Sequence, residues 1–184
     1  MISVPDMAGP EVYARARAVR LVLFDVDGVL TDGGLFIDDH GGEYKIFHSR
    51  DGHGIKTLLR SGVEVGVISG RKTPAVARRM ESLSIRHVFQ GQEEKLPVFQ
   101  ALIDRLSLTP QQAAFVGDDI VDLPILRRAG LAVAVADAHP LVKRYVHWET
   151  PSRGGRGAAR DVCDLVMHAQ GTLEDHVQHY LNVP

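Results

Sequence analysis

The composition of the chain is that of one folded globular domain. Of its 184 residues, 45% are hydrophobic and 24% are charged, which excludes wholesale disorder. Lys and Arg number 21 against 23 Asp and Glu, so the net charge is −2, and sequence-independent nucleic-acid binding, which needs a surplus of cations, is not expected. The single cysteine, Cys163, excludes an internal disulfide and favours a reducing compartment, and no apolar run approaches the ~20 residues that span a bilayer. We therefore predict one cytoplasmic domain over residues 1–184, with no nucleic-acid or membrane partner.

Short apolar runs alternate with amphipathic segments along the chain. Runs rich in Val, Ile and Leu predict strands at residues 20–24, 63–68, 87–89, 113–116 and 131–135. Helical spacing of apolar residues, with Thr-Pro and Gly at boundaries, predicts helices at 54–60, 73–83, 94–106, 122–129, 158–169 and 173–181. The strand runs are continuously apolar rather than alternating, which suits a sheet that is buried on both faces. This order of elements predicts an α/β fold with a doubly wound parallel sheet.

Two segments depart from this alternation. Residues 35–37 and 44–47 flank a glycine-containing turn and predict a β-hairpin flap over 35–47. Residues 151–157 contain three glycines and two arginines and predict a flexible basic loop, which opens a tail that continues through the last two helices to residue 184. Residues 1–18 suit either a short helix or a partly ordered arm, and the sequence leaves this open.

Polar side chains follow the predicted strands at the edge where open α/β sheets bind their ligands. Asp25 and Asp27 follow the strand 20–24, Ser69 follows 63–68, Asp118, Asp119 and Asp122 follow 113–116, and Lys95 lies at the start of a helix. Two positions apart on extended backbone, Asp25 and Asp27 face the same way. Several carboxylates at close range are costly unless a hard cation such as Mg²⁺ neutralises them. With a lysine and a hydroxyl suited to a phosphate, the set predicts phosphoryl transfer by a carboxylate nucleophile with an acid/base two residues away.

Each of these signals has an ordinary explanation when it is taken alone. A D-x-D or Gly-Asp-Asp string is usually a turn or a cap, Ser-Gly is a turn, and a lysine at a helix start is usually solvated. Function is favoured because all four signals occur at strand or helix ends. Receiver domains of signalling proteins also combine Asp, Ser or Thr, Lys and Mg²⁺. Their lysine lies near the end of the domain, however, whereas Lys95 precedes Asp118 here, and no lone Asp ends the second or third strand.

The motifs resemble those of the haloacid dehalogenase superfamily of phosphatases. They are DVDGVLTD at residues 25–32, SGR at 69–71, Lys95 and GDDIVD at 117–122. The resemblance implies that Asp25 is the nucleophile, which forms an aspartyl-phosphate, and that Asp27 is the general acid/base. It implies a Mg²⁺ cofactor held by Asp25, Asp118 and the backbone carbonyl of Asp27. It also implies that Ser69 and Lys95 bind the transferring phosphoryl group, with Asp119 and Asp122 in supporting roles.

Members of this superfamily often carry a cap domain, for which this chain has no room. One hairpin and one helix take up the stretch between Asp27 and Ser69, and one helix and one strand take up the stretch between Lys95 and Asp118. A site without a cap is open to water, so we expect either a large substrate or another subunit to cover it.

A closer resemblance favours cover by another subunit. The segments HSRDGHG at 48–54, ISGRK at 68–72, GQ at 91–92, VAVADAHP at 133–140 and GGRGAAR at 154–160 are similar to those of 3-deoxy-D-manno-octulosonate 8-phosphate phosphatases. This family implies hydrolysis of an eight-carbon keto-sugar acid phosphate in lipopolysaccharide precursor biosynthesis, by homotetramers whose hairpins form a central barrel. Phosphatases of nine-carbon keto-sugar acids share the catalytic motifs and stay an alternative, whereas the segment 154–160 is the more specific signal for the eight-carbon substrate.

A sugar acid needs cations for its carboxylate, away from the phosphate. The predicted substrate-binding residues are Asp27, His48, Ser49, Arg50, Asp51, Gly52, Lys56, Arg71, Arg79 and Lys95. Arginine is favoured because its planar fork matches a carboxylate. Arg79 suits a solvated helix face equally well, and Asp51 with Gly52 suits a cap for the helix at 54–60. In the basic loop, Arg153 and Arg156 are predicted to reach over the ligand, either in the same chain or across a subunit boundary.

Two other functions are weaker alternatives. A non-catalytic structural oligomer is disfavoured because every residue of the catalytic motifs is present. A phosphatase of nucleic-acid ends is permitted by the missing cap but disfavoured by the net charge of −2. His40, His48, His53 and His87 match no zinc-binding spacing, so ordinary polar roles are expected for them.

Overall fold

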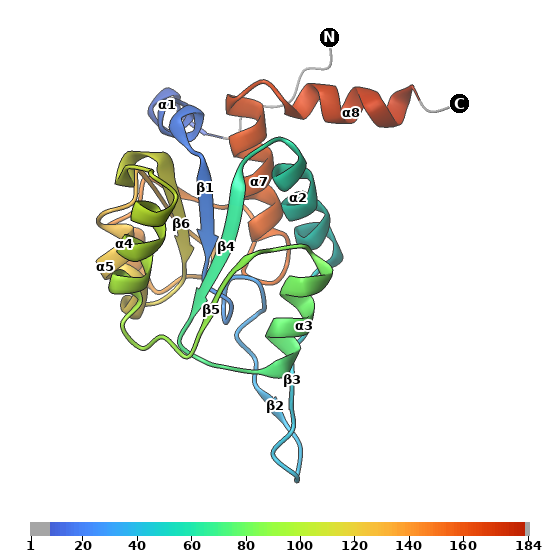
Figure 1. Ribbon diagram of the computed structural model, residues 1–184, viewed down its shortest axis with the longest axis vertical. Coiled ribbons are helices and arrows are strands. Elements are labelled where there is room, and N and C mark those ends of the chain that lie inside the picture. Colours follow the sequence, from blue (N-terminus) through green and yellow to red (C-terminus); the bar gives the residue numbers. More distant parts are fainter. Residues whose placement is uncertain (1–7, 183–184) are drawn as a thin grey trace.

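A six-stranded sheet forms the centre of the protein in a computed structural model that describes residues 8–182 (Figure 1). Its strands are β1 (Leu21–Phe24), β4 (Glu64–Ser69), β5 (His87–Gln90), β6 (Ala113–Gly117), β7 (Leu131–Ala134) and β8 (Trp148–Glu149). They run parallel in the order β5-β4-β1-β6-β7-β8. The prediction of a parallel sheet is confirmed, and β8 is a short edge strand that the sequence analysis missed.

Helices cover both faces of this sheet. They are α1 (Pro10–Ala18), α2 (Ser49–Arg60), α3 (Pro74–Ser82), α4 (Lys95–Arg105), α5 (Leu123–Leu126), α6 (Pro140–Lys143), α7 (Ala158–Ala169) and α8 (Leu173–Leu181), with short 3₁₀ turns η1 (Pro110–Gln112) and η2 (Ile120–Asp122). Figure 1 shows α2, α3 and α7 on one side of the sheet and α4 and α5 on the other. The sheet is therefore doubly wound, as predicted. No helix within residues 8–182 is long and apolar enough to cross a membrane.

Burial on both faces explains the continuous apolar runs of the sequence. All four side chains of β1 are 0% exposed, between α2 and α7 on one face and α4 and α5 on the other. Burying a Val, Leu or Phe side chain contributes roughly 1.5–3 kcal/mol, so burial of such runs in central strands stabilises the fold. Local signals set the helix ends: α3 starts where the Thr73 side chain accepts the Val76 N–H and Pro74 takes the first helical position.

The strand order fixes the location of the site. From β1 the chain moves to β4 and β5 on one side, then crosses to β6, β7 and β8 on the other. Such a reversal leaves a crevice outside the carboxyl ends of the central strands. Asp25 directly follows β1, Ser69 ends β4 and Asp118 directly follows β6.

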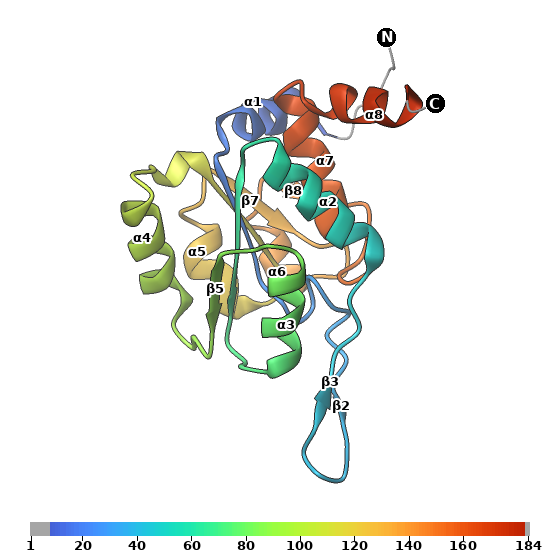
Figure 2. The same ribbon diagram turned by 45° about the vertical axis from the view of Figure 1, so that its right-hand side comes forward.

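The predicted hairpin is confirmed and projects away from the sheet (Figure 2). Its regular pairing is short, between β2 (Phe36–Ile37) and β3 (Glu43–Tyr44). Apolar side chains point into solvent, with Phe36 67% exposed and Ile46 73% exposed. The rings of Phe36 and Tyr44 meet edge to face, with centroids 5.6 Å apart. A two-stranded hairpin with this much exposed apolar surface is typical of an interaction surface.

Local structure differs from prediction at three places. Helix α2 begins at Ser49 rather than at residue 54, because Asp51 and Gly52 turn inward and are buried in its first turns instead of capping it. The predicted helix 122–129 is only the short α5, which follows η2. The loop 151–157 is not free, because the three glycines Gly154, Gly155 and Gly157 are buried.

The ends of the chain are placed in part. The helix that was one of two expectations for residues 1–18 is present as α1, with Val12 and Ala16 buried. Residues 1–7 lie outside the described part of the chain, as do residues 183–184 of the predicted tail. Within the tail, α7 and α8 have the predicted bounds.

Candidate active site

A buried lysine joins two aspartates at the centre of the crevice. Lys95, the first residue of α4, places Nζ 2.9 Å from Asp25 Oδ2 and 2.7 Å from Asp122 Oδ1. Asp25 is 6% exposed, Lys95 5% and Asp122 0%. The other oxygen of Asp25, Oδ1, accepts the Val26 N–H at 2.7 Å. Two of the predicted catalytic residues, Asp25 and Lys95, are thus in direct contact.

Asp118 brings a third carboxylate to this pair. Oxygen atoms of Asp25, Asp118 and Asp122 lie within 4.8 Å of one another. Asp122 Oδ2 accepts the Asp118 N–H at 3.1 Å, whereas the buried Oδ1 of Asp118 has no hydrogen-bond partner within residues 8–182. Gly28 packs against this carboxylate, since a Cβ there would lie 2.0 Å from Asp118 Oδ2. Three carboxylates with one lysine and an orphaned oxygen fit a hard divalent cation such as Mg²⁺.

The electrostatics of the site support a bound cation. Burial, followed by repulsion from Asp122, raises the pKa of Asp25 to about 7. Burial, followed by repulsion from Asp25 and then from Asp122, raises the pKa of Asp118 to about 8. Without a cation the site therefore holds protons near neutral pH, and a metal ion would displace them.

A second buried lysine was missed by the sequence analysis. Lys45, directly after β3, forms ion pairs with Asp27 and, at 2.8 Å, with Glu43, and its side chain is 1% exposed. Glu43 also accepts a bond from Arg71 Nη2 at 2.8 Å, so the base of the hairpin contacts the loops after β1 and β4. Asp27 Oδ2 is buried and has no partner among the described residues. The alternation of an extended strand was the available signal, because Glu43 and Lys45 are two positions apart and share a face.

These side chains surround a cavity of about 380 Å³ at the carboxyl ends of the strands. Its lining residues are Asp25, Asp27, Ser69, Gly70, Arg71, Gln92, Glu93, Lys95, Asp118, Asp119 and Val121. The structure thus brings together all the predicted catalytic residues, with Arg71 and Asp119. Asp119 is exposed and its Oδ1 accepts the Ile120 N–H at 2.7 Å, which caps η2. Gly70, Gln92 and Val121 belong to the quoted motifs but had no predicted role, and Glu93 was not predicted at all.

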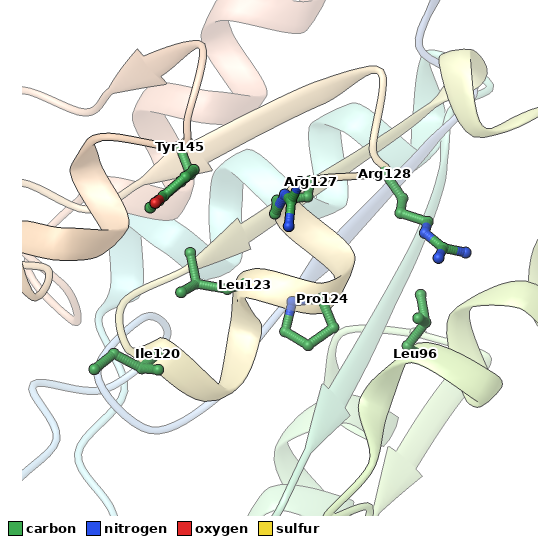
Figure 3. Close-up of a pocket in the computed structure, with 7 residues that line it drawn as sticks. All are labelled: Leu96, Ile120, Leu123, Pro124, Arg127, Arg128 and Tyr145. Carbon is green, nitrogen blue, oxygen red and sulfur yellow. The ribbon is translucent and has the colours of Figure 1, made fainter.

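A larger cavity, of about 570 Å³, lies beside η2 between α4 and α5 (Figure 3). Its lining residues are Leu96, Ile120, Leu123, Pro124, Arg127, Arg128 and Tyr145. None of these residues is a carboxylate, so this cavity lacks ligands for a hard cation, and its one nucleophile, Tyr145, has no lysine or carboxylate beside it in the lining. Size alone therefore does not identify the reactive site, and the acidic cavity is the candidate.

Seven of the predicted substrate residues lie outside the acidic cavity. His48, Asp51, Gly52 and Arg79 line a separate, very small hollow between α2 and α3. Asp51 is 3% exposed, and its carboxylate accepts the backbone N–H groups of Arg160 at 2.9 Å and Gly157 at 3.3 Å. The Asp51 carboxylate therefore caps the start of α7, which lies more than 100 residues further along the chain.

Arg79 and His48 keep unpaired polar atoms in this hollow. Gly52 makes room for Arg79, since a Cβ at Gly52 would lie 2.3 Å from Arg79 Nη2. Arg79 Nη2 donates to the His48 carbonyl at 3.5 Å, but Arg79 Nε and His48 Nδ1 are buried and have no partner in the part of the chain that the structure describes. The remaining predicted residues Ser49, Arg50 and Lys56 are exposed on α2 and do not line the acidic cavity.

The loop 151–157 packs against the turn that follows β1. The Gly154 N–H donates to Asp137 Oδ1 at 2.9 Å, and the Gly155 N–H donates to the Val29 carbonyl at 2.8 Å. A Cβ on Gly154 would lie 1.7 Å from the Gly28 carbonyl oxygen, so the two backbones are in contact. These hydrogen bonds hold the backbone against the turn after β1 in the same chain, at a place where a flexible loop was predicted. Arg156 pairs with Asp32 at 3.1 Å, and both side chains are exposed.

Aspartates, a lysine and a serine at the carboxyl ends of a doubly wound sheet define a class of protein, the haloacid dehalogenase-like hydrolases. The sequence model of that description matches residues 87–160. A 3-deoxy-D-manno-octulosonate 8-phosphate phosphatase of Escherichia coli K12 is 47% identical over 165 residues, which cover 90% of this chain and 88% of the relative. The chain therefore belongs, within these hydrolases, to the family of 3-deoxy-D-manno-octulosonate 8-phosphate phosphatases.

Solved structures agree with this assignment. A probable YrbI family phosphatase from Pseudomonas syringae is 48% identical, with a TM-score of 0.94 over 96% of this chain and 100% of that one. The 3-deoxy-D-manno-octulosonate 8-phosphate phosphatase of Moraxella catarrhalis, solved with a magnesium ion, a phosphate ion and a KDO molecule, is 34% identical. Its TM-score is 0.91 over 92% of this chain and 98% of that one.

Proposed function

We propose that this protein is a Mg²⁺-dependent phosphatase that hydrolyses 3-deoxy-D-manno-octulosonate 8-phosphate to the free keto-sugar acid and phosphate. The observation that carries the proposal is the cluster of Asp25, Asp118 and Asp122 around Lys95, buried at the carboxyl end of the sheet. The names of the relatives at 47% and 34% identity support the substrate. Release of this sugar acid serves lipopolysaccharide precursor biosynthesis.

The proposed reaction uses two carboxylates in turn. Asp25 attacks phosphorus through one oxygen and forms an aspartyl-phosphate, while Asp27 gives its proton to the departing sugar oxygen. Asp27 then takes a proton from water, which attacks the same phosphorus, releases phosphate and restores Asp25. Lys95 keeps Asp25 oriented and, together with Ser69, neutralises and hydrogen-bonds the phosphoryl oxygens. Lys45 Nζ pairs with Asp27 Oδ1. When Asp27 carries a proton, the Lys45 ammonium must therefore move away or bind the other oxygen of the carboxyl group.

Mg²⁺ would be held by Asp25, Asp118 and the backbone carbonyl of Asp27. When bound, it supplies positive charge for the phosphoryl oxygens and separates the carboxylates from one another. Asp122 acts on this set indirectly, because its oxygens are taken by Lys95 Nζ and the Asp118 N–H. Asp119 supports the same loop by capping η2.

The carboxylate of the sugar acid needs a cation beyond the phosphate. Arg71 lines the cavity and is held by Glu43, so it is available in the same chain. Arg79 and His48 have unpaired polar atoms in the small hollow between α2 and α3. Arg50 and Lys56 are exposed on α2, which forms one wall of that hollow. We assign these four side chains to substrate binding across a subunit boundary, since they lie outside the acidic cavity of their own chain.

A homotetramer would bring such a boundary to each site. The exposed apolar hairpin supports association of this kind, because its side chains have no cover in the single chain. Residues 8–182 contain no cap domain, so a neighbouring subunit would provide the cover that excludes water. We place the enzyme in the cytoplasm, where its one cysteine, the buried Cys163, would stay reduced.

A panel of substrates tests the proposal. Phosphate release is measured with Mg²⁺ on 3-deoxy-octulosonate 8-phosphate, a nine-carbon keto-sugar acid phosphate, glucose 6-phosphate and p-nitrophenyl phosphate. We expect the eight-carbon substrate to exceed the two generic ones in kcat/KM by about a hundredfold or more, since pairing one extra carboxylate with arginine contributes roughly 3 kcal/mol. Preference for the nine-carbon acid would move the assignment to that substrate, and equal rates would indicate a generalist phosphatase.

A further inference from the structure

A histidine pair joins α8 to α2 at the end of the molecule away from the hairpin (Figures 1 and 2). Helix α8 buries only Leu173 of its own residues, so apolar contacts hold it weakly. His53 on α2 and His176 on α8 direct their Nε2 atoms at one another across 3.4 Å. The Tyr180 ring flanks both imidazoles, with centroids 5.1 Å from His176 and 6.1 Å from His53.

The hydrogen bonds around this pair leave the lone pair of His53 Nε2 available to a ligand. Thr57 Oγ1 donates its only proton to the His53 carbonyl at 3.0 Å. The 3.3 Å contact between Thr57 Oγ1 and His176 Nε2 must then have His176 as the donor. His53 Nε2 consequently faces the same N–H as an acceptor. One N–H of His176 is therefore shared between Thr57 Oγ1 and His53 Nε2 at long distances. A metal ion that binds both Nε2 atoms can replace this weak hydrogen bond.

The separation of the two nitrogens is that of two ligands on one tetrahedral ion. Zinc binds imidazole nitrogen at about 2.0–2.1 Å, and two such nitrogens at a tetrahedral angle lie roughly 3.3–3.4 Å apart. We propose that His53 and His176 form a site for a borderline transition-metal ion of the Zn²⁺, Ni²⁺ or Cu²⁺ class. No linear spacing could show this site, because 123 residues separate the two histidines.

The chemistry of this site differs from that of the acidic cavity. Imidazole suits Zn²⁺, Ni²⁺ and Cu²⁺, whereas the carboxylate cluster suits Mg²⁺. Asp164 is near His176, but both of its oxygens lie 2.7 Å from Arg160 Nε, so the remaining positions on the ion fall to water. Binding moves the His176 proton to Nδ1, and no net proton is lost when both rings are neutral. A site with two protein ligands is an open one, and we expect micromolar affinity.

The consequence of binding is a cross-link between α2 and α8. The ion would tie the last helix to α2, which itself packs against α7. Helix α8 would then be protected from local opening. The apolar contacts of Leu173 alone do not give this protection, because Leu173 is the only residue of α8 that is buried. The site is a device for metal-dependent ordering of the C-terminal helix, independent of the reaction at the carboxylates.

Calorimetric titration with zinc chloride tests the site in full-length protein under saturating Mg²⁺. Every protein is prepared with and without Asp118→Asn, which removes zinc binding at the carboxylates. We expect one zinc equivalent that survives Asp118→Asn and is weakened at least about tenfold by His53→Gln or His176→Gln. His179→Gln is the matched control, since His179 is on the same helix and contacts the Tyr180 ring at 5.5 Å without joining the nitrogen pair.

Two further measurements separate metal binding from a general effect of the substitutions. Melting curves without zinc check that each variant folds. In the Asp118→Asn background, only the protein with both histidines and its His179→Gln variant should gain melting temperature on adding zinc. With Co²⁺, the visible absorption of nitrogen ligation should disappear in His53→Gln and His176→Gln. The proposal would be overturned if the Asp118→Asn protein bound no zinc equivalent. It would also be overturned if His179→Gln weakened zinc binding as much as His53→Gln or His176→Gln does.

Discussion

Removing magnesium should make the folded protein less stable as the pH rises. Asp25 and Asp118 have pKa values raised to about 7 and about 8 by burial and by repulsion from neighbouring carboxylates, whereas an unfolded Asp titrates near 3.9. Between these values the folded state holds protons that the unfolded state has lost. The slope of the free energy of unfolding against pH is therefore negative, and the stability that is present below pH ~4 is lost as the pH passes through the folded pKa values.

The size of this loss follows from the number of groups involved. One fully protonated group gives a slope of at most about 1.4 kcal/mol per pH unit. Two groups set an upper limit of roughly 5 kcal/mol between pH 5.5 and 7.5, and solvent at the less buried Asp118 reduces it. We expect a loss of about 2–4 kcal/mol in metal-free protein. Magnesium opposes this loss, since it binds only the folded state and contributes about 2.7 kcal/mol at a hundred times its Kd.

Urea unfolding at pH 5.5, 6.5 and 7.5, with chelator or with saturating Mg²⁺, measures this effect. The difference between the two conditions should grow with pH, because Mg²⁺ needs the carboxylates without their protons. Asp118→Asn removes one of the two raised groups and should reduce the slope in chelator by about half. A metal-free free energy of unfolding that is flat or rises over this range, or a slope that Asp118→Asn leaves unchanged, would refute the reasoning.

Three further variants test individual residues. Asp25→Asn should keep the fold but lower phosphate release more than about a thousandfold, because an amide cannot act as the nucleophile, and retained turnover would exclude an aspartyl-phosphate. Asp51→Ala should lower the free energy of unfolding by about 2–4 kcal/mol, since it leaves two N–H donors of α7 without an acceptor, whereas an unchanged urea midpoint would contradict its capping role. Arg156→Ala should leave the melting temperature within about one degree, because its exposed pair with Asp32 contributes at most about 1 kcal/mol, yet it should raise KM; unchanged kinetics would exclude a role for Arg156 in binding.

The sheet was predictable from sequence because its strands are buried on both faces. Runs such as Leu21–Phe24 can form few other structures, and the hydrophobic effect alone specifies them. Helix ends were predictable where a local signal exists, as at Thr73 and Pro74. The start of α2 was not, because Asp51 in its first turn is stabilised by the backbone of α7, far away in sequence. A tertiary contact there overrides the local preference for a cap.

The catalytic side chains were predictable for a related reason. Asp25, Ser69, Lys95 and Asp118 all lie at the end of a strand or the start of a helix, so the topology of the sheet brings them together. Lys45 was not predictable in the same way, because its position depends on the angle at which the hairpin leaves the core. Alternation along the strand places Glu43 and Lys45 on one face, but no periodicity encodes the contact of Lys45 with Asp27.

The backbone contacts of the basic loop change the account of the site. Three glycines suggested freedom, but Gly154 is needed because its backbone touches the Gly28 carbonyl oxygen, and Gly28 in turn leaves no space beside Asp118. These contacts form a chain from the loop to a carboxylate of the metal cluster. The backbone of the loop is therefore part of the support that positions Asp118. The exposed side chains of Arg153 and Arg156 extend from this hydrogen-bonded backbone, and they are the part of the loop that is predicted to reach over the ligand.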